Sequence, residues 1–268
     1  MSQTEGLAEA ERIAYRQRLD VFLPSRESAN TLTMDALRAG IRLQTVICAA
    51  ADVAHYADEA LAIVQDEYRP RLDCRAGCSY CCCKPGVLVS VPDLLRIVDH
   101  IGSAFSADAA AAVGERARRY ASQMEGRGLS EYVGESVPCP LLVDGRCSVY
   151  DIRPLVCRGY NSTNVDRCRQ AHLDPEALVP IFSVLKDVTD GAMVGAAQGL
   201  KAAGFNDALV DLGTGLNIAL SANDRFTAAV VAGDTLLATA ENASWADDMW
   251  ARVCDIARQV GIEPSPSG

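Results

Sequence analysis

Cys74-Arg-Ala-Gly-Cys78-Ser-Tyr-Cys81-Cys82-Cys83 places five cysteines within ten residues of a 268-residue chain. A second, more widely spaced set follows: Cys139, Cys147, Cys157 and Cys168. Thiolate is a soft ligand, and cysteines at this density are typical of zinc or iron–sulfur binding. We therefore expect the rest of the chain to form a frame that holds these two cysteine-rich segments together.

The composition limits the class of protein. Hydrophobic residues make up 49% of the chain and charged residues 22%, which is enough apolar material for a core that does not depend on a metal alone. The formal net charge is −10. Nucleic-acid binding rests largely on Lys and Arg at phosphates, so we expect no nucleic-acid partner. The partner is left open as a small-molecule or protein substrate, and so is the oligomeric state.

The N-terminal residues carry charges where a secretory signal would need an apolar run, and no apolar stretch is long enough to span a bilayer. These features predict a cytoplasmic protein with no membrane partner. In that reducing compartment, we expect the eleven cysteines to be ligands or free thiols rather than disulfides.

Helical periodicity dominates and strand alternation is weak, so the predicted fold is mostly α, with two cysteine-rich loop segments converging on a metal centre. We expect a single domain over 1–268. Its parts are N-terminal helices in 1–70, a cysteine-cluster metal-binding core in 71–172, C-terminal helices in 173–260 and a flexible tail in 261–268.

Capping residues and prolines set the expected helix boundaries. One helix begins at Thr33 and runs to Tyr68, where Pro70 stops it, and the composition from Gly126 to Ala171 predicts loops and short turns. The other expected helices are Pro92–Gly102, Ser106–Met124, Ala177–Ala203, Asn206–Leu220, Asn223–Ala240 and Ser244–Val260.

The adjacent pair Cys81-Cys82 bears on the type of metal site. Neighbouring side chains diverge, by about 100° on a helix and to opposite faces on a strand. The pair is therefore hard to fit into one mononuclear tetrahedral site. Either one of the two thiols lies outside the ligand shell, or the centre is multinuclear, or two metal sites lie side by side.

The two-part pattern is specific. It reads Cys74-x3-Cys78-x2-Cys81-Cys82, then Cys139-Pro-Leu-Leu-Val-Asp-Gly-Arg-Cys147-Ser-Val-Tyr150-Asp-Ile-Arg153-Pro154-Leu-Val-Cys157-Arg158-Gly-Tyr160. From about Leu72 to Cys168 the chain resembles the YkgJ-type cysteine-cluster family, which has a zinc- or iron-chelating CxxCxxCC domain. Some relatives are methyltransferases that act on flagellin lysines with an iron–sulfur centre.

The resemblance implies metal or iron–sulfur binding through eight thiols: Cys74, Cys78, Cys81, Cys82, Cys139, Cys147, Cys157 and Cys168. Cys83 lies outside the family pattern. We expect Arg153 and Arg158 to contribute to cofactor binding, because several thiolates around one centre carry excess negative charge that guanidinium groups offset. A surface ion pair between Arg153 and Asp151 is the alternative for the first of these arginines.

Two rival interpretations stay open. Cys74-x3-Cys78-x-Tyr80-Cys81 also satisfies the C-x3-C-x-aromatic-C pattern of radical SAM enzymes, but the strand–helix alternation of their barrel is absent. A structural zinc site in an interaction module is the second rival. The surplus of thiols beyond four favours an iron–sulfur centre, redox-active or supporting an enzyme activity such as methyl transfer. Whether the protein is an enzyme is left open.

The sequence also leads to predictions for three further residues. His172 follows Cys168 by four positions and is a possible additional ligand, although a role outside the site is favoured. Cys48 and Cys254 lie in apolar helical contexts, where a free cysteine behaves as a small hydrophobe, so both are predicted to be core residues.

Overall fold

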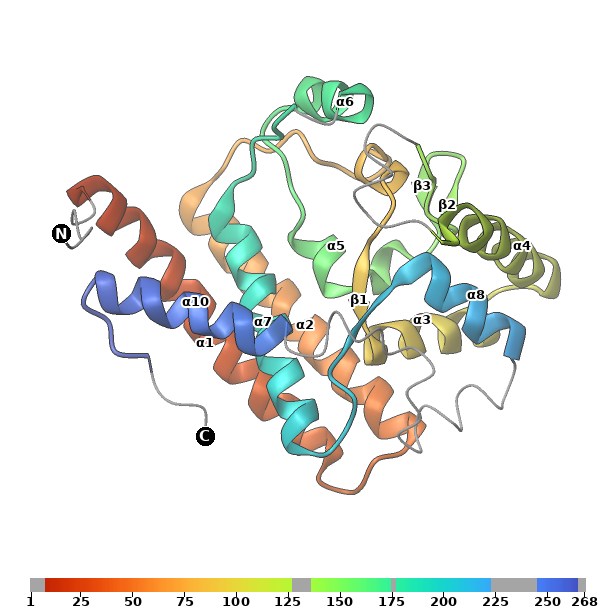
Figure 1. Ribbon diagram of the computed structural model, residues 1–268, viewed down its shortest axis with the longest axis horizontal. Helices are drawn as coiled ribbons and strands as arrows, with labels where there is room; N and C mark the ends of the chain where they lie inside the picture. The colour runs from red at the N-terminus through yellow and green to blue at the C-terminus, as the bar shows by residue number, and fades with distance from the viewer. Residues whose placement is uncertain (1–7, 127–135, 175–176, 223–244, 265–268) are drawn as a thin grey trace.

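The computed structural model of the chain describes residues 8–126, 136–174, 177–222 and 245–264. These residues are mostly helical, which confirms the prediction of a mostly α fold. Three long helices lie side by side, and a fourth packs on two of them, α1 and α7 (Figure 1). They are α1 (Glu9–Leu37), α2 (Leu43–Tyr68), α7 (Ser183–Ala202) and α10 (Trp245–Gln259).

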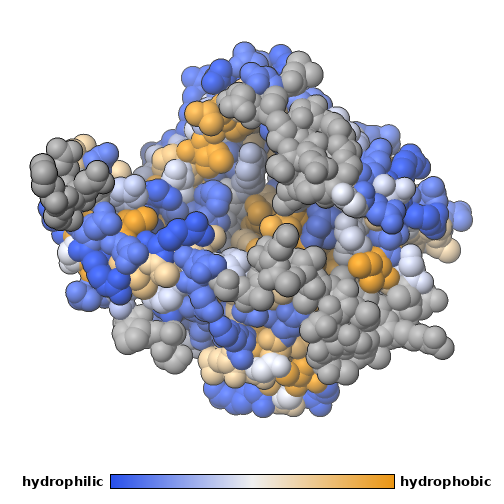
Figure 2. Space-filling model, viewed as in Figure 1, coloured by the Kyte–Doolittle hydropathy of each residue, from blue (hydrophilic) through white to orange (hydrophobic). Residues whose placement is uncertain are grey.

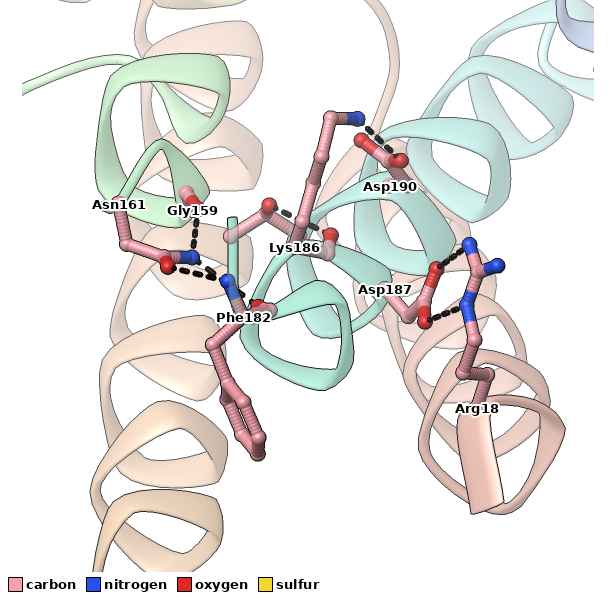
Figure 3. Close-up of polar contacts among 8 residues, drawn as sticks. Arg18, Gly159, Asn161, Phe182, Lys186, Asp187 and Asp190 are labelled. Atoms are coloured by element: carbon pink, nitrogen blue, oxygen red, sulfur yellow. Dashed lines mark hydrogen bonds and ion pairs between the residues drawn. The ribbon is translucent and has the colours of Figure 1, made fainter. Parts of the chain in front are cut away.

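Helices α1 and α7 approach closely because glycines of α7 face the backbone of α1. A Cβ atom at Gly195 would lie 1.9 Å from the Arg26 carbonyl oxygen, and one at Gly191 would lie 2.3 Å from the Phe22 carbonyl oxygen. Only a residue without a side chain fits at this separation. At one end of the pair, Arg18 of α1 donates two hydrogen bonds, of 2.7 and 2.9 Å, to Asp187 of α7 (Figure 3).

A second group of elements packs beside α2 around the largest apolar cluster, which includes Leu94, Ile97 and Leu216. Its members are β1 (Leu88–Ser90), α3 (Val91–Ala104), α4 (Ala107–Met124), β4 (Leu209–Asp211) and α8 (Leu212–Ala222). Strands β1 and β4 pair antiparallel, with Val89 opposite Val210. The Ser90 hydroxyl caps α3 by accepting a hydrogen bond of 3.2 Å from the Asp93 amide.

The cysteine-rich segments are built from short elements between these helices. They are the 3₁₀ turns η1 (Cys81–Cys83) and η3 (Tyr150–Ile152), the hairpin strands β2 (Leu142–Val143) and β3 (Arg146–Cys147), and the helices α5 (Leu155–Gly159) and α6 (Val165–Leu173). In Figure 1, α6 lies at the edge of the molecule farthest from the turn between α1 and α2.

The structure corrects several boundaries. The expected helix start at Thr33 is wrong, because Thr33 is a buried residue inside α1. The chain instead breaks between Leu37 and Leu43, where Gly40 has φ +101°, a conformation that favours glycine. Residues 165–171, expected to be loop, belong to helix α6 (Val165–Leu173), whose first turn is capped by Asn164.

The structure also changes the boundaries predicted for the C-terminal helices. The helix expected from Asn206 is preceded by strand β4, because Leu209–Asp211 pairs with β1. The helix expected from Ala177 begins at Ser183, and the predicted Ser244–Val260 helix is observed as α10. The predicted helix over 223–240 lies outside the described residues.

The face of the molecule shown in Figure 2 is mostly hydrophilic, with separate apolar patches. One exposed apolar residue is Leu178, 79% exposed, in the extended segment before α7. None of the helices in the described part of the chain has both the length and the apolar character that crossing a membrane requires.

Candidate metal centre

Backbone hydrogen bonds join the two cysteine-rich segments. The Cys139 amide donates to the Cys82 carbonyl over 2.7 Å, and the Val137 amide donates to the Cys83 carbonyl over 3.0 Å. Residues separated by more than fifty positions are therefore paired without any bridging ion. The second segment lies against turn η1 of the first.

A separate set of contacts ties the first segment to α6, which carries Cys168. The Asp73 amide donates to the Ser162 carbonyl over 2.9 Å, and the Asp73 carboxylate accepts a 3.0 Å hydrogen bond from the Val165 amide at the start of α6. Negative charge at a helix N-terminus is favourable. Near the other end of the segment, the Arg169 side chain of α6 donates to the Tyr80 hydroxyl over 3.1 Å.

Helix α5, which carries Cys157, is fixed to the helical frame by Arg158. The Arg158 guanidinium donates to the Arg153 carbonyl over 2.7 Å and to the Asp151 carbonyl over 2.9 Å, and it forms an ion pair with Asp58 of α2. Its side chain is only 3% exposed. The guanidinium therefore braces the backbone of the turn before Cys157, and a direct role at the cofactor stays a prediction.

The end of α5 is attached to the start of α7 by Asn161. Its side-chain amide donates to the carbonyls of Gly159 (3.0 Å) and Phe182 (3.2 Å), and its oxygen accepts a 2.9 Å hydrogen bond from the Phe182 amide (Figure 3). Helix α5 is thus held at both ends by buried polar side chains. These contacts of Arg158 and Asn161 fix the position of Cys157 in the chain fold.

All the predicted ligand cysteines are free thiols; Cys81 is exposed and the other seven are half-buried. Within the described ranges, no three His, Cys, Asp or Glu side chains lie close enough together to hold a metal ion. The hydrogen bonds bring the segments together, whereas their convergence on a formed metal centre stays a prediction.

The vicinal thiols are closer than the sequence predicts. The sulfur atoms of Cys81 and Cys82 are 4.0 Å apart, so these side chains do not diverge as expected from their adjacency. Two sulfurs bound to one tetrahedral zinc at about 2.3 Å are separated by about 3.8 Å. The pair is therefore compatible with a single ion, and the argument for several metals rests on the number of thiols instead.

Burial keeps three of the predicted ligand thiols protonated in the absence of metal. It raises the pKa of Cys74 to about 11 and that of Cys139 and Cys157 to about 12, and neighbouring thiols add to each shift. A metal cation stabilises the thiolate form and displaces these protons. We therefore expect metal binding at neutral pH to release protons.

Unpaired polar atoms around the thiols fit an anionic thiolate centre. Among the described residues, the buried atoms Arg153 Nε, Ser148 Oγ and His172 Nδ1 have no hydrogen-bond partner. Buried polar groups normally have partners, so each is available to a ligand or to a ligating sulfur. Arg153 also stacks over the Tyr150 ring, with its guanidinium carbon 3.9 Å from the ring centre.

The positive charge of Arg153 acts on two predicted ligands. Burial raises the pKa of Cys147 and of Cys157, and Arg153 offsets part of each shift. This is the effect expected of a guanidinium that stabilises thiolates. The ion pair with Asp151 that was the alternative for Arg153 is not found among the described residues.

The remaining sequence expectations have mixed outcomes. Cys48 is exposed on α2, so its prediction as a core residue is wrong, whereas Cys254 is buried as predicted. The Cys83 thiol hydrogen-bonds to Ser136, and the His172 ring lies 6.3 Å from that of Tyr80. Neither observation makes Cys83 or His172 a ligand.

Sequence reasoning missed the acidic residues that support the site. Asp58 and Asp73 bind partners about a hundred positions away in the chain, as described above. Buried Asp93 of α3 hydrogen-bonds to the Leu155 amide at the start of α5. Only the position of Asp73, immediately before Cys74, offered any signal.

Comparison with known proteins supports a chelating domain in the cysteine-rich region. No curated protein and no solved structure gives a significant match to the chain. A protein-family model does match, and its bounds agree with those of the resemblance found from the sequence, which runs from about Leu72 to Cys168. Residues 73–174 match the model of the CxxCxxCC family, described as a putative zinc- or iron-chelating domain.

Proposed function

We propose that the protein holds an iron–sulfur centre on the thiolates of its two cysteine-rich segments and uses it for electron transfer. The observation that carries the proposal is the backbone hydrogen bond from the Cys139 amide to the Cys82 carbonyl, which joins the two cysteine-rich segments. Four thiolates satisfy one zinc ion or one four-iron cluster. The eight predicted ligands exceed that number, which favours a centre with more than one metal ion over a single structural ion.

The position of the thiols favours electron transfer. Cys81 is exposed, and the nearby Tyr160 is 38% exposed, so the centre would lie close to the surface where a redox partner docks. A cavity between α1, α2, α3 and α7 is lined by Thr33, Ser90, Asp93 and apolar residues, but by no cysteine. This cavity therefore offers no substrate chamber against the thiols, and an activity such as methyl transfer would need a different substrate site.

The resident group supplies electron storage when it is bound. The chain contributes the sulfur ligands, the charge of Arg153 beside Cys147 and Cys157, and the braces on α5. Positive charge and hydrogen bonds near the sulfurs raise the reduction potential of such centres. Arg153 is therefore expected to tune that potential, and Arg158 to hold the ligand segment in place.

A structural zinc site is the second candidate, and the 4.0 Å separation of the Cys81 and Cys82 sulfurs favours it. In that case the zinc would lock η1 to its neighbours, and the helical frame would serve as an interaction surface for a protein partner. No redox chemistry would follow, because zinc has a single stable oxidation state in proteins.

Metal and sulfide analysis of anaerobically purified protein distinguishes the two candidates. Iron with acid-labile sulfide and broad visible absorption is expected, and stoichiometric zinc in a colourless protein would favour the structural site. Cys78→Ala and Cys157→Ala should lose metal, whereas Cys48→Ala, at an exposed position outside the cluster, should keep it. Equal metal retention in all three variants would overturn the assignment of ligands.

A further inference from the structure

We infer that the surface around the cysteine-rich segments is a docking site for an acidic electron-transfer protein. The inference rests on the proposed electron-transfer function and specifies the partner by its charge. Three features of these segments carry it: an excess of positive charge, exposed arginines without ion pairs, and exposed aromatic and apolar side chains.

The cysteine-rich segments are basic although the chain as a whole is acidic. Residues 69–84 and 139–174 contain nine Lys and Arg and five Asp, with no Glu, so their formal net charge is +4. The whole chain carries −10. Positive charge is therefore concentrated on the part of the chain that holds the eight predicted ligands. Such a distribution steers an acidic partner toward this part of the surface.

Three of these cations are available to a partner. Arg71, Arg75 and Arg146 are exposed, and none of them forms an ion pair with another described residue. The ion pairs of this region use other arginines, such as Arg158 and Arg169. An exposed guanidinium without an ion pair can bind a carboxylate of a partner through two parallel hydrogen bonds.

These three arginines lie around turn η1. Arg71 and Arg75 stand on either side of Asp73, whose hydrogen bonds attach this segment to the start of α6. Arg146 lies in the β2–β3 hairpin, which follows the backbone hydrogen bond between Cys139 and η1. In Figure 1, α6 and the hairpin both lie toward the end of the molecule away from the turn between α1 and α2. The cations therefore belong to one end of the molecule.

Exposed aromatic and apolar side chains accompany the arginines. Of the seven exposed large hydrophobic residues in the described part of the chain, four lie in this region: Val143, Tyr150, Tyr160 and Leu178. The segment that carries Leu178 is attached here, because the Thr163 amide donates to the Pro180 carbonyl over 3.2 Å. Tyrosine and arginine are enriched at protein–protein interfaces. A nucleic acid would be repelled by the acidic remainder of the chain, so the combination favours a protein partner.

The exposed thiol of Cys81 lies within this surface, on η1. A docked carrier would therefore come close to the predicted ligands. The step that it performs is a one-electron transfer: the carrier is oxidised by one electron, the bound centre is reduced by one, and no bond forms or breaks.

Plant-type ferredoxin is a suitable probe, because it is an acidic one-electron donor with a reduction potential of about −400 mV. Binding of oxidised ferredoxin to the full-length, metal-loaded protein is measured by isothermal titration calorimetry, and electron transfer from reduced ferredoxin by anaerobic stopped-flow absorbance. We expect the affinity and the second-order rate to fall about tenfold or more between about 20 and 200 mM salt.

Charge reversal tests the surface directly. Arg71→Glu and Arg146→Glu should each weaken ferredoxin binding and slow electron transfer by roughly three- to tenfold, with unchanged metal content and circular dichroism. Arg252→Glu is the matched control, because Arg252 is exposed on α10, which packs against α1 and α7 instead of the cysteine-rich segments. This variant should behave like the wild-type protein.

The outcomes separate the docking surface from the proposed function. Absence of ferredoxin binding at low salt, equal losses in Arg252→Glu and the two test variants, or tighter binding of a single-stranded oligonucleotide than of ferredoxin would overturn the docking surface and leave metal binding untouched. A colourless zinc protein that binds ferredoxin through Arg71 and Arg146 but accepts no electron would overturn the proposed electron transfer and keep the surface as a docking site for an acidic protein.

Discussion

The amide nitrogen of Cys139 lies 2.7 Å from the carbonyl oxygen of Cys82, so two predicted ligand segments are joined through their backbones. The large apolar clusters of the described residues are formed mainly by the helices that surround these segments. A core of this kind supplies folding energy from apolar burial, independently of a metal. The helical scaffold is therefore expected to fold before the metal binds.

Metal removal should leave the fold largely intact. We expect the metal-free protein to keep its far-ultraviolet circular dichroism and a cooperative thermal transition, with a lower Tm because the bound metal stabilises only the folded state. The measurement is a thermal melt before and after dialysis against a chelator and a reductant. A metal-free protein that is unfolded at 25 °C would show that the metal, and not the helical core, drives folding.

Arg158 should contribute to stability through its buried contacts. Arg158→Lys keeps the charge but cannot donate at once to the Arg153 carbonyl, the Asp151 carbonyl and Asp58. We expect a loss of roughly 2–4 kcal/mol in the free energy of unfolding, because buried acceptors lose their donors. Urea denaturation of the metal-free protein measures it.

Arg258→Lys is the matched control for this substitution. Arg258 pairs with Asp255 on the exposed face of α10, with 58% of its side chain accessible. Exposed pairs of this kind contribute about 0–1 kcal/mol, so the control should change little. Similar losses in the two variants would mean that Arg158 does not brace α5 in the way the structure indicates.

The close approach of α1 and α7 should not tolerate a methyl group. Gly195→Ala places a Cβ atom 1.9 Å from the Arg26 carbonyl oxygen, and a backbone atom cannot move away as a flexible side chain can. We expect a loss of about 1–3 kcal/mol or more from overpacking, measured by urea denaturation. Gly114→Ala in α4, where nothing lies within 4 Å, should be neutral or stabilising by up to about 1 kcal/mol. A neutral Gly195→Ala would show that the two helices separate readily.

How much of this structure the sequence could predict depends on the range of the interactions. The helices α3 and α4 follow from local signals: Pro92 stands in the first turn of α3 and Ser106 precedes α4, close to where the sequence places both starts. Strand β4 could not be predicted in the same way, because it exists through its pairing with β1, about 120 positions earlier. The break after Leu37 was missed because the apolar period continues across Gly40.

The same distinction holds for the candidate site. The cysteines are recognisable because their density and spacing are local properties of the sequence. The supporting residues are not, because Asp58 and Asp93 acquire their roles only when α2 and α3 pack against α5. The 4.0 Å separation of the vicinal sulfurs was also unpredicted, since it depends on the 3₁₀ turn in which Cys81 and Cys82 lie.

Asp93 should make stability fall as the pH rises between about 4 and 7. Burial raises its pKa to about 6, although Ser90, Arg96, the Leu155 amide and Arg158 partly offset the shift, and the unfolded chain ionises near 4. The folded state therefore keeps the proton to a higher pH than the unfolded state. The stability that this provides is complete below pH 4 and is lost as the pH rises through 6.

Asp93→Asn should remove this dependence, because an amide oxygen can still accept from the Leu155 amide but does not ionise. The unfolding free energy of the wild-type protein, relative to the variant, should fall by on the order of 2–3 kcal/mol between pH 4 and 7. Urea denaturation of both metal-free proteins across that range measures the difference. Asp99→Asn, on the exposed side of the same helix, controls for the loss of one negative charge. A constant difference between wild type and Asp93→Asn across the range would mean that the Asp93 carboxyl is solvated in the folded protein, and that α5 is held by Arg158 and Asn161 without it.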